Sequence, residues 1–238
     1  MDIQISTERL DLILGNHALI AMNIFELLAF ISGLAYWKKF TGSPIIVFII
    51  FLGYNFFNEM IAAAINVTGI LNRTTVFYNL RYLFYFSAIY WIYYKYLKYQ
   101  LYKQTVVVLY FTWLITLFYF VLTSNFVIQK PVFSAVTGDF FLIIIILFYL
   151  IETIKNADLS RIQDLPLIYI SVGLLISTVI QLPVSIINYK GWLNLTEVSN
   201  SLNTFYSIIR NTSFWSYSLM YGIFAFGFYK AKPQEVKS

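Results

Sequence analysis

Asn55, Glu59 and Asn66 lie in a long apolar segment that reads YNFFNEMIAAAIN from residue 54 to residue 66. At 100° per residue, these three positions fall on one face of an α-helix. An ionisable side chain in an apolar span is costly, so it is expected to face protein or a water-filled cavity and to mark a functional site. We therefore take Glu59 as the carboxylate around which the chemistry of this chain is organised.

Other apolar segments carry polar side chains at a similar depth. Counted at 1.5 Å per residue from the expected helix ends, they lie roughly 10 to 14 Å inside the same boundary. Arginine is suited to carboxylates and phosphates through bidentate hydrogen bonds. We expect an outward-facing polar pocket for a small polar or anionic ligand, lined by Glu26, Asn55, Glu59, Arg81, Asp139, Gln181, Arg210 and Asn211. The alternative is a closed network of ion pairs and hydrogen bonds that only fixes the register of the helices.

Motifs for metal binding and catalysis are missing from the sequence. The chain has no Cys and a single His, His17, which excludes disulfides, thiol nucleophiles and His-rich metal sites. Neither His-Glu-x-x-His nor Gly-x-Ser-x-Gly occurs. Glu59 and Asp139 could serve a carboxylate-only hydrolase, but no spacing supports that reading. We leave enzymatic activity open but favour a protein that is not an enzyme. We expect no metal and no cofactor.

Composition places the chain among integral membrane proteins. Its 238 residues are 60% hydrophobic and only 11% charged, with a mean hydropathy of +0.72, whereas soluble domains carry about 25% charged residues. Seven spans of about 23 residues with short connections would use the whole length. We expect a single all-α membrane domain over residues 1–238 without an output domain of its own. The net charge of +5 does not indicate nucleic-acid binding, because the basic residues lie between helices.

Apolar runs predict seven transmembrane helices. Pro44, Pro131 and Pro166 stand at helix starts, where a missing N–H is tolerated. Pro183 is expected to kink or end the sixth helix. The first sixteen residues are net acidic, so we expect no cleavable signal peptide. The predicted helices cover residues 17–37, 44–66, 75–97, 104–124, 132–154, 165–187 and 203–229.

The distribution of Lys and Arg predicts the orientation. Short loops rich in these residues stay in the cytoplasm. One side of the predicted bundle collects Lys38, Lys39, Lys95, Lys98, Lys103, Lys155, Arg161, Lys230, Lys232 and Lys237, and the other side only Arg9, Arg73, Lys130 and Lys190. We expect the N-terminus outside and the C-terminus in the cytoplasm of a bacterial inner membrane. The basic loops would contact anionic lipid or a cytoplasmic partner.

Aromatic residues make up 20% of the chain and concentrate in the run YWIYYKYLKYQLY from Tyr90 to Tyr102. Amphipathic rings settle at the membrane–water interface. We interpret this run as an interfacial belt, and the alternative is a surface that stacks on a carbohydrate or a quinone.

Three segments carry a resemblance to known proteins: NLRYLFYFSAIYWIYYKYLKY, GDFFLIIIILFYLIE and SLNTFYSIIRNTSFWSYSLMYGIFAFGFYK. In these segments the chain resembles small seven-helix membrane proteins of unassigned function from Bacteroidota-type bacteria, and is similar to the membrane-embedded sensor modules of bacterial histidine kinases. The resemblance implies sensing or complex formation. It assigns no role to an individual residue.

The leading hypothesis is therefore a membrane sensor or partner-binding module. A second reading is a small transporter or channel. In that reading helices one to three and five to seven repeat an acid, an amide and an arginine around a linker helix, with Glu26, Asn55 and Arg81 matching Asp139, Gln181 and Arg210. A third reading is a structural subunit of a membrane complex.

Overall fold

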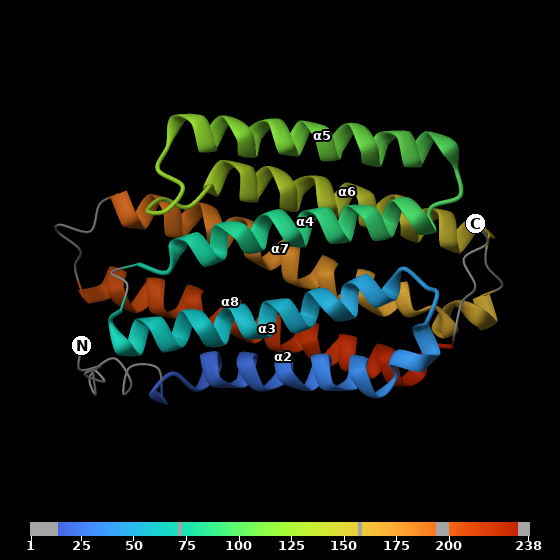
Figure 1. The fold of residues 1–238 in the computed structure, drawn as a ribbon, viewed down its shortest axis with the longest axis horizontal. Helices are drawn as coiled ribbons and strands as arrows, with labels where there is room; N and C mark the ends of the chain where they lie inside the picture. The colour runs from blue at the N-terminus through green and yellow to red at the C-terminus, as the bar shows by residue number, and fades with distance from the viewer. Residues whose placement is uncertain (1–13, 71–72, 157–158, 194–199, 233–238) are drawn as a thin grey trace.

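In the described part of the chain, seven long α-helices run up and down in one bundle (Figure 1). The computed structural model describes residues 14–70, 73–156, 159–193 and 200–232, of which 159–161, 188–193 and 200–203 are described by their backbone alone. Within these ranges no strand occurs. The helices are α2 (His17–Ala35), α3 (Ile45–Thr68), α4 (Thr75–Tyr96), α5 (Gln100–Thr123), α6 (Val132–Asn156), α7 (Pro166–Leu193) and α8 (Asn200–Lys230), with short 3₁₀ turns at Trp37–Phe40 and Leu159–Asp164.

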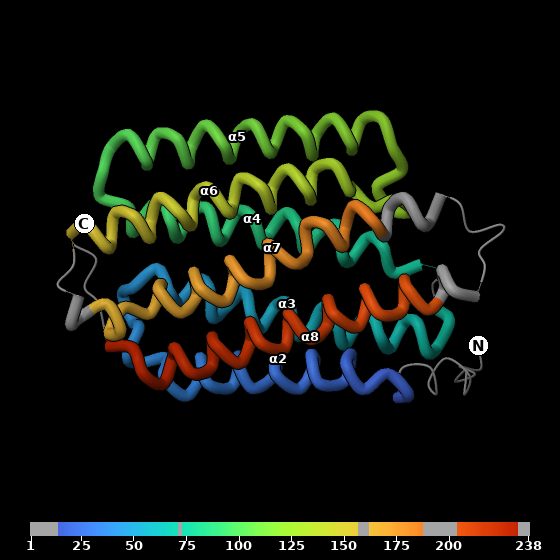
Figure 2. The backbone as a smooth tube through the Cα atoms, turned by 180° about the vertical axis from the view of Figure 1, so that it is seen from behind, coloured from blue at the N-terminus to red at the C-terminus, as the bar shows by residue number. Residues whose placement is uncertain are grey.

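Each helix packs against the next one in the chain, and two further contacts complete the arrangement. α2 lies along α8, which closes the bundle into a ring, and α4 contacts α6. As a result α5 lies outside the ring, packed on α4 and α6 (Figures 1 and 2). α8 has the most extensive contacts, with α2 on one side and α7 on the other.

The two ends of the bundle differ in charge. We name them the His17 end, where α2, α4, α6 and α8 begin, and the Lys230 end, where these helices finish. The helix bounds place Arg73 and Lys130 at the His17 end. Many more basic residues lie at or near the Lys230 end, namely Lys38, Lys39, Lys95, Lys98, Lys103, Lys155, Lys230 and Lys232.

Five of the helices are long and apolar enough to cross a membrane, namely α2, α3, α5, α6 and α7. α4 and α8 fall short of the same threshold. Both contain an arginine and many tyrosines, which hydropathy scales treat as polar. The predicted all-helical fold with seven helices is confirmed for the described residues, whereas seven membrane crossings remain a prediction.

Aromatic side chains fill the core toward the Lys230 end. Phe48 of α3 meets Phe224 of α8 edge to face, with ring centroids 5.0 Å apart, and Phe40 contacts Phe228 in the same way at 5.9 Å. All four rings are at most 1% exposed. Buried aromatic side chains therefore fill the interior of this half of the bundle.

The tyrosine run of α4 is divided between core and surface, which corrects its interpretation as an interfacial belt alone. Tyr90 and Tyr93 are buried. Tyr93 hydrogen-bonds Ser171 of α7 at 2.8 Å, and its ring contacts that of Tyr149. Only the opposite side of the helix, with residues such as Trp91, faces outward.

Two helix bounds differ most from those predicted, namely the start of α5 and the end of α7, for reasons that lie outside the local sequence. α5 begins at Gln100, four residues early, because Glu152 of α6 accepts hydrogen bonds from the backbone N–H groups of Lys98 and Tyr99 at 2.5 and 3.2 Å. Although Glu152 lies near the end of α6, it is only 4% exposed. α7 continues past Pro183 to Leu193, since neighbouring helices can stabilise a membrane helix that contains proline.

Candidate functional site

The polar face of α3 is the centre of the candidate site. Asn55, Asn58 and Ala62 are buried on it, and Glu59 is half-buried. Asn58 donates a hydrogen bond to the carbonyl of Phe77 at 3.3 Å, which ties α3 to α4. Residues three and four positions apart lie side by side on a helix. From this shared face Asn55 contacts α2 and α8, whereas Glu59, one turn further on, contacts α4.

A first polar cluster joins α2, α3 and α8. The Asn55 amide donates to the Glu26 carboxylate and to the Tyr221 hydroxyl, the latter at 2.9 Å. Glu26 is completely buried, and its second oxygen, Oε2, has no hydrogen-bond partner among the described residues. One amide thus fixes three helices at the same depth.

A second polar cluster joins α3, α4 and the connection between α5 and α6. Arg81 forms an ion pair with Glu59. The Tyr78 hydroxyl donates to the other oxygen of Glu59 at 3.2 Å. The Arg81 guanidinium and the Lys130 ammonium both lie near the Tyr78 ring, 5.3 and 5.9 Å from its centroid. Two cations therefore flank one tyrosine and one carboxylate.

This second cluster is partly accessible. The side chains of Arg81 and Glu59 are 23% and 16% exposed, and Lys130 as a whole is exposed. The pKa of the Lys130 ammonium is nevertheless lowered, first by desolvation and then by repulsion from Arg81, while Glu59 opposes the shift. Positive charge is thus concentrated at this position.

The connection that carries Lys130 is held by α4. Asn79, which is fully buried, donates to the carbonyls of Phe126 and Gln129 at 2.6 and 2.8 Å. Arg73 donates to the carbonyl of Ile128 at 3.5 Å. These bonds fix the backbone just before Lys130.

Asp139 of α6 faces the interior but is not part of either cluster. It is half-buried and has no hydrogen bond or ion pair within the described part of the chain. It lies near Tyr82 and Tyr85 of α4 and Tyr217 of α8. Tyr82 and Tyr217 also interact with Arg81. Tyr82 and Tyr217 therefore lie near both Asp139 and Arg81.

Gln181 belongs to a closed network between α7 and α8. Its amide donates to the carbonyl of Ser213 at 3.1 Å and to the Ser216 hydroxyl at 2.9 Å, and its oxygen accepts from the Ser213 hydroxyl at 2.7 Å. All three residues are buried. Both amide hydrogens of Gln181 are used in these bonds. Gln181 therefore fixes the register of α7 against α8 and has no free hydrogen-bond donor for a ligand.

Arg210 is placed apart from the other predicted site residues. It lies near the His17 end of α8, is exposed, and has no ion-pair partner in the described structure. The neighbouring Asn211 is half-buried, and its Oδ1 atom has no hydrogen-bond partner among the described residues. The buried residues of α8 instead include Ser213, Ser216, Met220, Tyr221, Phe224 and Phe228.

The structure thus brings together Glu26, Asn55, Glu59 and Arg81, and it adds residues that the sequence did not single out. These are Tyr78, Tyr82, Lys130, Tyr217 and Tyr221. Glu26 lies within electrostatic range of both Glu59 and Arg81, so the two clusters form one polar region. Tyr78 lies one turn before Arg81 on α4, and that spacing is the one sequence feature that could have identified it.

The polar region combines a carboxylate, a guanidinium, an ammonium group and a phenol. No group of three or more acidic or histidine side chains suited to a metal ion occurs among the described residues. No protein-family model, curated protein or solved structure matches the chain. The similarity to kinase sensor modules therefore remains a prediction.

Proposed function

We propose that the protein is a membrane sensor or partner-binding module whose Glu59–Arg81 cluster binds a small anionic ligand from outside the cell. The observation that carries the proposal is the accessible ion pair, in which Arg81 keeps 23% of its side chain exposed while contacting Glu59. An arginine at such a place can exchange or share its carboxylate partner with an incoming carboxylate or phosphate. Lys130 supplies a second positive charge at the same position.

The membrane topology belongs to the same proposal. α4 and α8 lie alongside α3 and α2, so a bilayer crossed by the five apolar helices would be crossed by all seven. The concentration of lysines at the Lys230 end favours a cytoplasmic position for that end, in a bacterial inner membrane. The Glu59–Arg81 cluster then faces outward.

The packing favours sensing over transport. A transporter needs polar groups along the whole path, but the Lys230 half is filled by rings such as Phe40, Phe48 and Phe228. The hydroxyls of Ser171 and Ser216 are already used in hydrogen bonds within the bundle. A site open at one end and closed at the other suits a receptor that passes its state to a partner.

The test is thermal unfolding of the purified protein in detergent with sodium phosphate, acetate or succinate, each compared with sodium chloride at equal ionic strength. Ligand binding stabilises the native state by about 2.7 kcal/mol at a hundredfold excess over Kd, which corresponds to a rise on the order of 5 °C in a chain of this size. We expect at least one of these anions to raise the Tm of the wild type in a saturable way.

Three variants identify the site. Arg81→Gln should abolish the anion-induced rise, and Lys130→Gln should reduce it. Arg210→Gln is the matched control, because Arg210 is exposed and lies outside the cluster. The comparison uses the anion-induced difference, so a lower starting Tm does not obscure it. An equal rise in Arg81→Gln and wild type, or no rise with any anion, would contradict the proposal.

A further inference from the structure

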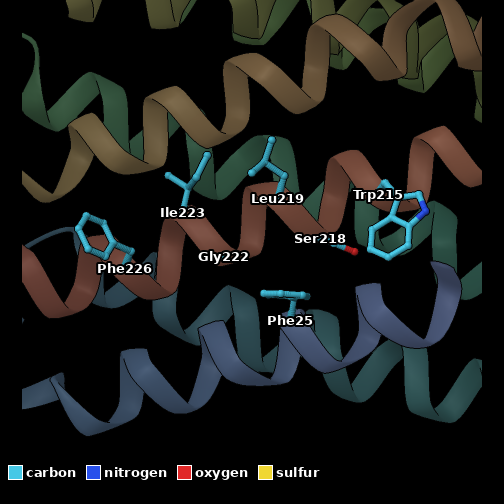
Figure 3. A pocket seen from close by; sticks show the side chains of 7 residues that line it. All are labelled: Phe25, Trp215, Ser218, Leu219, Gly222, Ile223 and Phe226. Atoms are coloured by element: carbon cyan, nitrogen blue, oxygen red, sulfur yellow. The ribbon is translucent and has the colours of Figure 1, made fainter. Parts of the chain in front are cut away.

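An apolar groove runs along the outward face of α8, beside α2 (Figure 3). Trp215, Leu219 and Phe226 rise from α8 along its length, and Phe25 of α2 stands against it from the other side. The groove has a volume of about 390 Å³. Its four large side chains are between 38% and 55% exposed.

Gly222 forms the floor of the groove, and the packing of the chain does not require a glycine there. A Cβ atom at Gly222 would have the Phe25 ring as its nearest neighbour, at an ordinary 3.5 Å. At Gly173 and Gly227, by contrast, a Cβ atom would approach Phe224 and Tyr169 to 2.7 and 2.5 Å. Those two glycines allow helices to pack closely, whereas Gly222 leaves space on the outside of the bundle.

The groove has the length of one membrane leaflet. Trp215, Leu219, Gly222 and Phe226 follow the spacing of a single helix face, and Lys230 continues the same stripe. Trp215 and Phe226 are eleven residues apart, about 16 Å along the helix axis. The hydrocarbon core of a bilayer is about 30 Å thick, so each leaflet contributes about 15 Å.

The Lys230 end of the groove is cationic. Lys230 is exposed and has no salt-bridge partner among the described residues. The ammonium of Lys39 lies close by, bound to the carbonyls of Phe228 and Tyr229 at 3.0 Å each, and burial lowers its pKa. The exposed Lys38 is next to it in the chain. Positive charge therefore stands where a lipid headgroup would meet an acyl chain lying in the groove.

We propose that this groove holds one acyl chain of an anionic phospholipid from the leaflet at the Lys230 end, with the headgroup phosphate bound by Lys230. The matching length, the apolar walls and the cation at one end all point to this occupant. A partner helix would need no cation at the end of its groove. The inference rests on α8 spanning the bilayer and is independent of the anion site at Glu59 and Arg81.

Native mass spectrometry tests the proposal on the full chain in detergent containing equal amounts of phosphatidylglycerol and phosphatidylethanolamine with identical acyl chains. We expect the wild type to retain one phosphatidylglycerol. Gly222→Leu should lose this retention, because its side chain fills the groove. Lys230→Gln should lower the preference for phosphatidylglycerol about fivefold, since a lysine near an anionic lipid surface is worth about 1 kcal/mol. Lys103→Gln, a lysine near the same end on α5, should behave like the wild type.

Several outcomes would overturn the inference. Retention that is equal in the wild type and Gly222→Leu would mean that the lipid binds elsewhere. A wild-type dimer that Gly222→Leu dissociates would mean that the groove holds a second copy of the chain. If Gly222→Leu shows no cooperative unfolding transition and so does not fold, the test relies on Lys230→Gln. An unchanged preference for phosphatidylglycerol in Lys230→Gln would then refute the headgroup contact. The anion-induced Tm rise of the wild type serves as the separate readout for the outer site.

Discussion

Glu26 shows how the bundle treats a carboxylate that it buries completely. One oxygen accepts a hydrogen bond from Asn55, and the other has no partner in the described structure. A charge in apolar surroundings is costly unless it is paired and hydrogen-bonded. The cluster with Asn55 and Tyr221 thus requires a hydrogen-bond acceptor at position 26, on a side chain as long as that of Glu. The amide of Gln can also provide this acceptor.

We predict that Glu26→Gln unfolds close to the wild-type temperature and that Glu26→Ala is destabilised by about 2 kcal/mol. The alanine variant leaves the Asn55 amide without its acceptor and opens a cavity. Thermal unfolding of the purified protein in detergent measures both variants, and Glu26→Gln is the matched control. If Glu26→Gln were as unstable as Glu26→Ala, the negative charge itself would be required, and our reading of the cluster would be wrong.

Arg81 and Arg210 show which part of the site could be predicted from sequence. Both were correctly expected near the same end of the bundle, because depth follows from counting residues along a helix. Only Arg81 is paired, whereas Arg210 is exposed. α8 carries Ser, Thr, Asn and Tyr residues among its apolar ones over most of its length, so its sequence gives little indication of which face turns inward. The packing of α8 between α2 and α7 determines which face turns inward.

At the scale of elements, the apolar runs were sufficient to predict seven helices, and most predicted bounds agree with the structure within a few residues. The start of α5 could not be predicted, because the acceptor for the N–H groups before it comes from α6. Glu152, which supplies that acceptor, lies more than fifty residues further along the chain. Local sequence does not contain such a contact.

We predict that Glu152→Ala destabilises the protein by about 1 to 3 kcal/mol, because two backbone N–H groups lose a buried charged acceptor. Glu152→Gln keeps one acceptor oxygen and should lie between this variant and the wild type. Trypsin should cleave after Lys98 faster in Glu152→Ala, since the turn before α5 loosens. Limited proteolysis and thermal unfolding measure these effects.

Asp164→Asn provides the control for this prediction. Asp164 pairs with Lys232 at 2.9 Å, but the lysine side chain is 71% exposed, and such surface pairs contribute at most about 1 kcal/mol. Cleavage after Lys98 should therefore match the wild type in Asp164→Asn. Cleavage in Glu152→Ala no faster than in this control would show that α5 does not depend on Glu152.

At the scale of the whole molecule, the two halves of the bundle differ in what fills them. The His17 half contains the Glu59–Arg81 pair with accessible side chains, and the Lys230 half is filled by buried rings such as Phe48 and Phe224. The orientation of the bundle therefore determines from which side of the membrane the polar site can be reached. A ligand that approaches from the His17 side meets a polar site, whereas one that approaches from the Lys230 side meets packed aromatic side chains.

The orientation can be tested with single cysteines, because the natural chain contains none. Gln129 lies in the connection at the His17 end and Thr41 in the connection at the Lys230 end, and both are exposed. Positive residues are retained on the cytoplasmic side, so we predict that a membrane-impermeant maleimide labels Gln129→Cys in intact cells. Thr41→Cys should react only after the membrane is permeabilised. The unmodified chain is the blank, and labelling of both variants after permeabilisation shows that both thiols are reactive. The opposite pattern would place the Glu59–Arg81 cluster on the cytoplasmic side, and its ligand would then have to be a cytoplasmic anion.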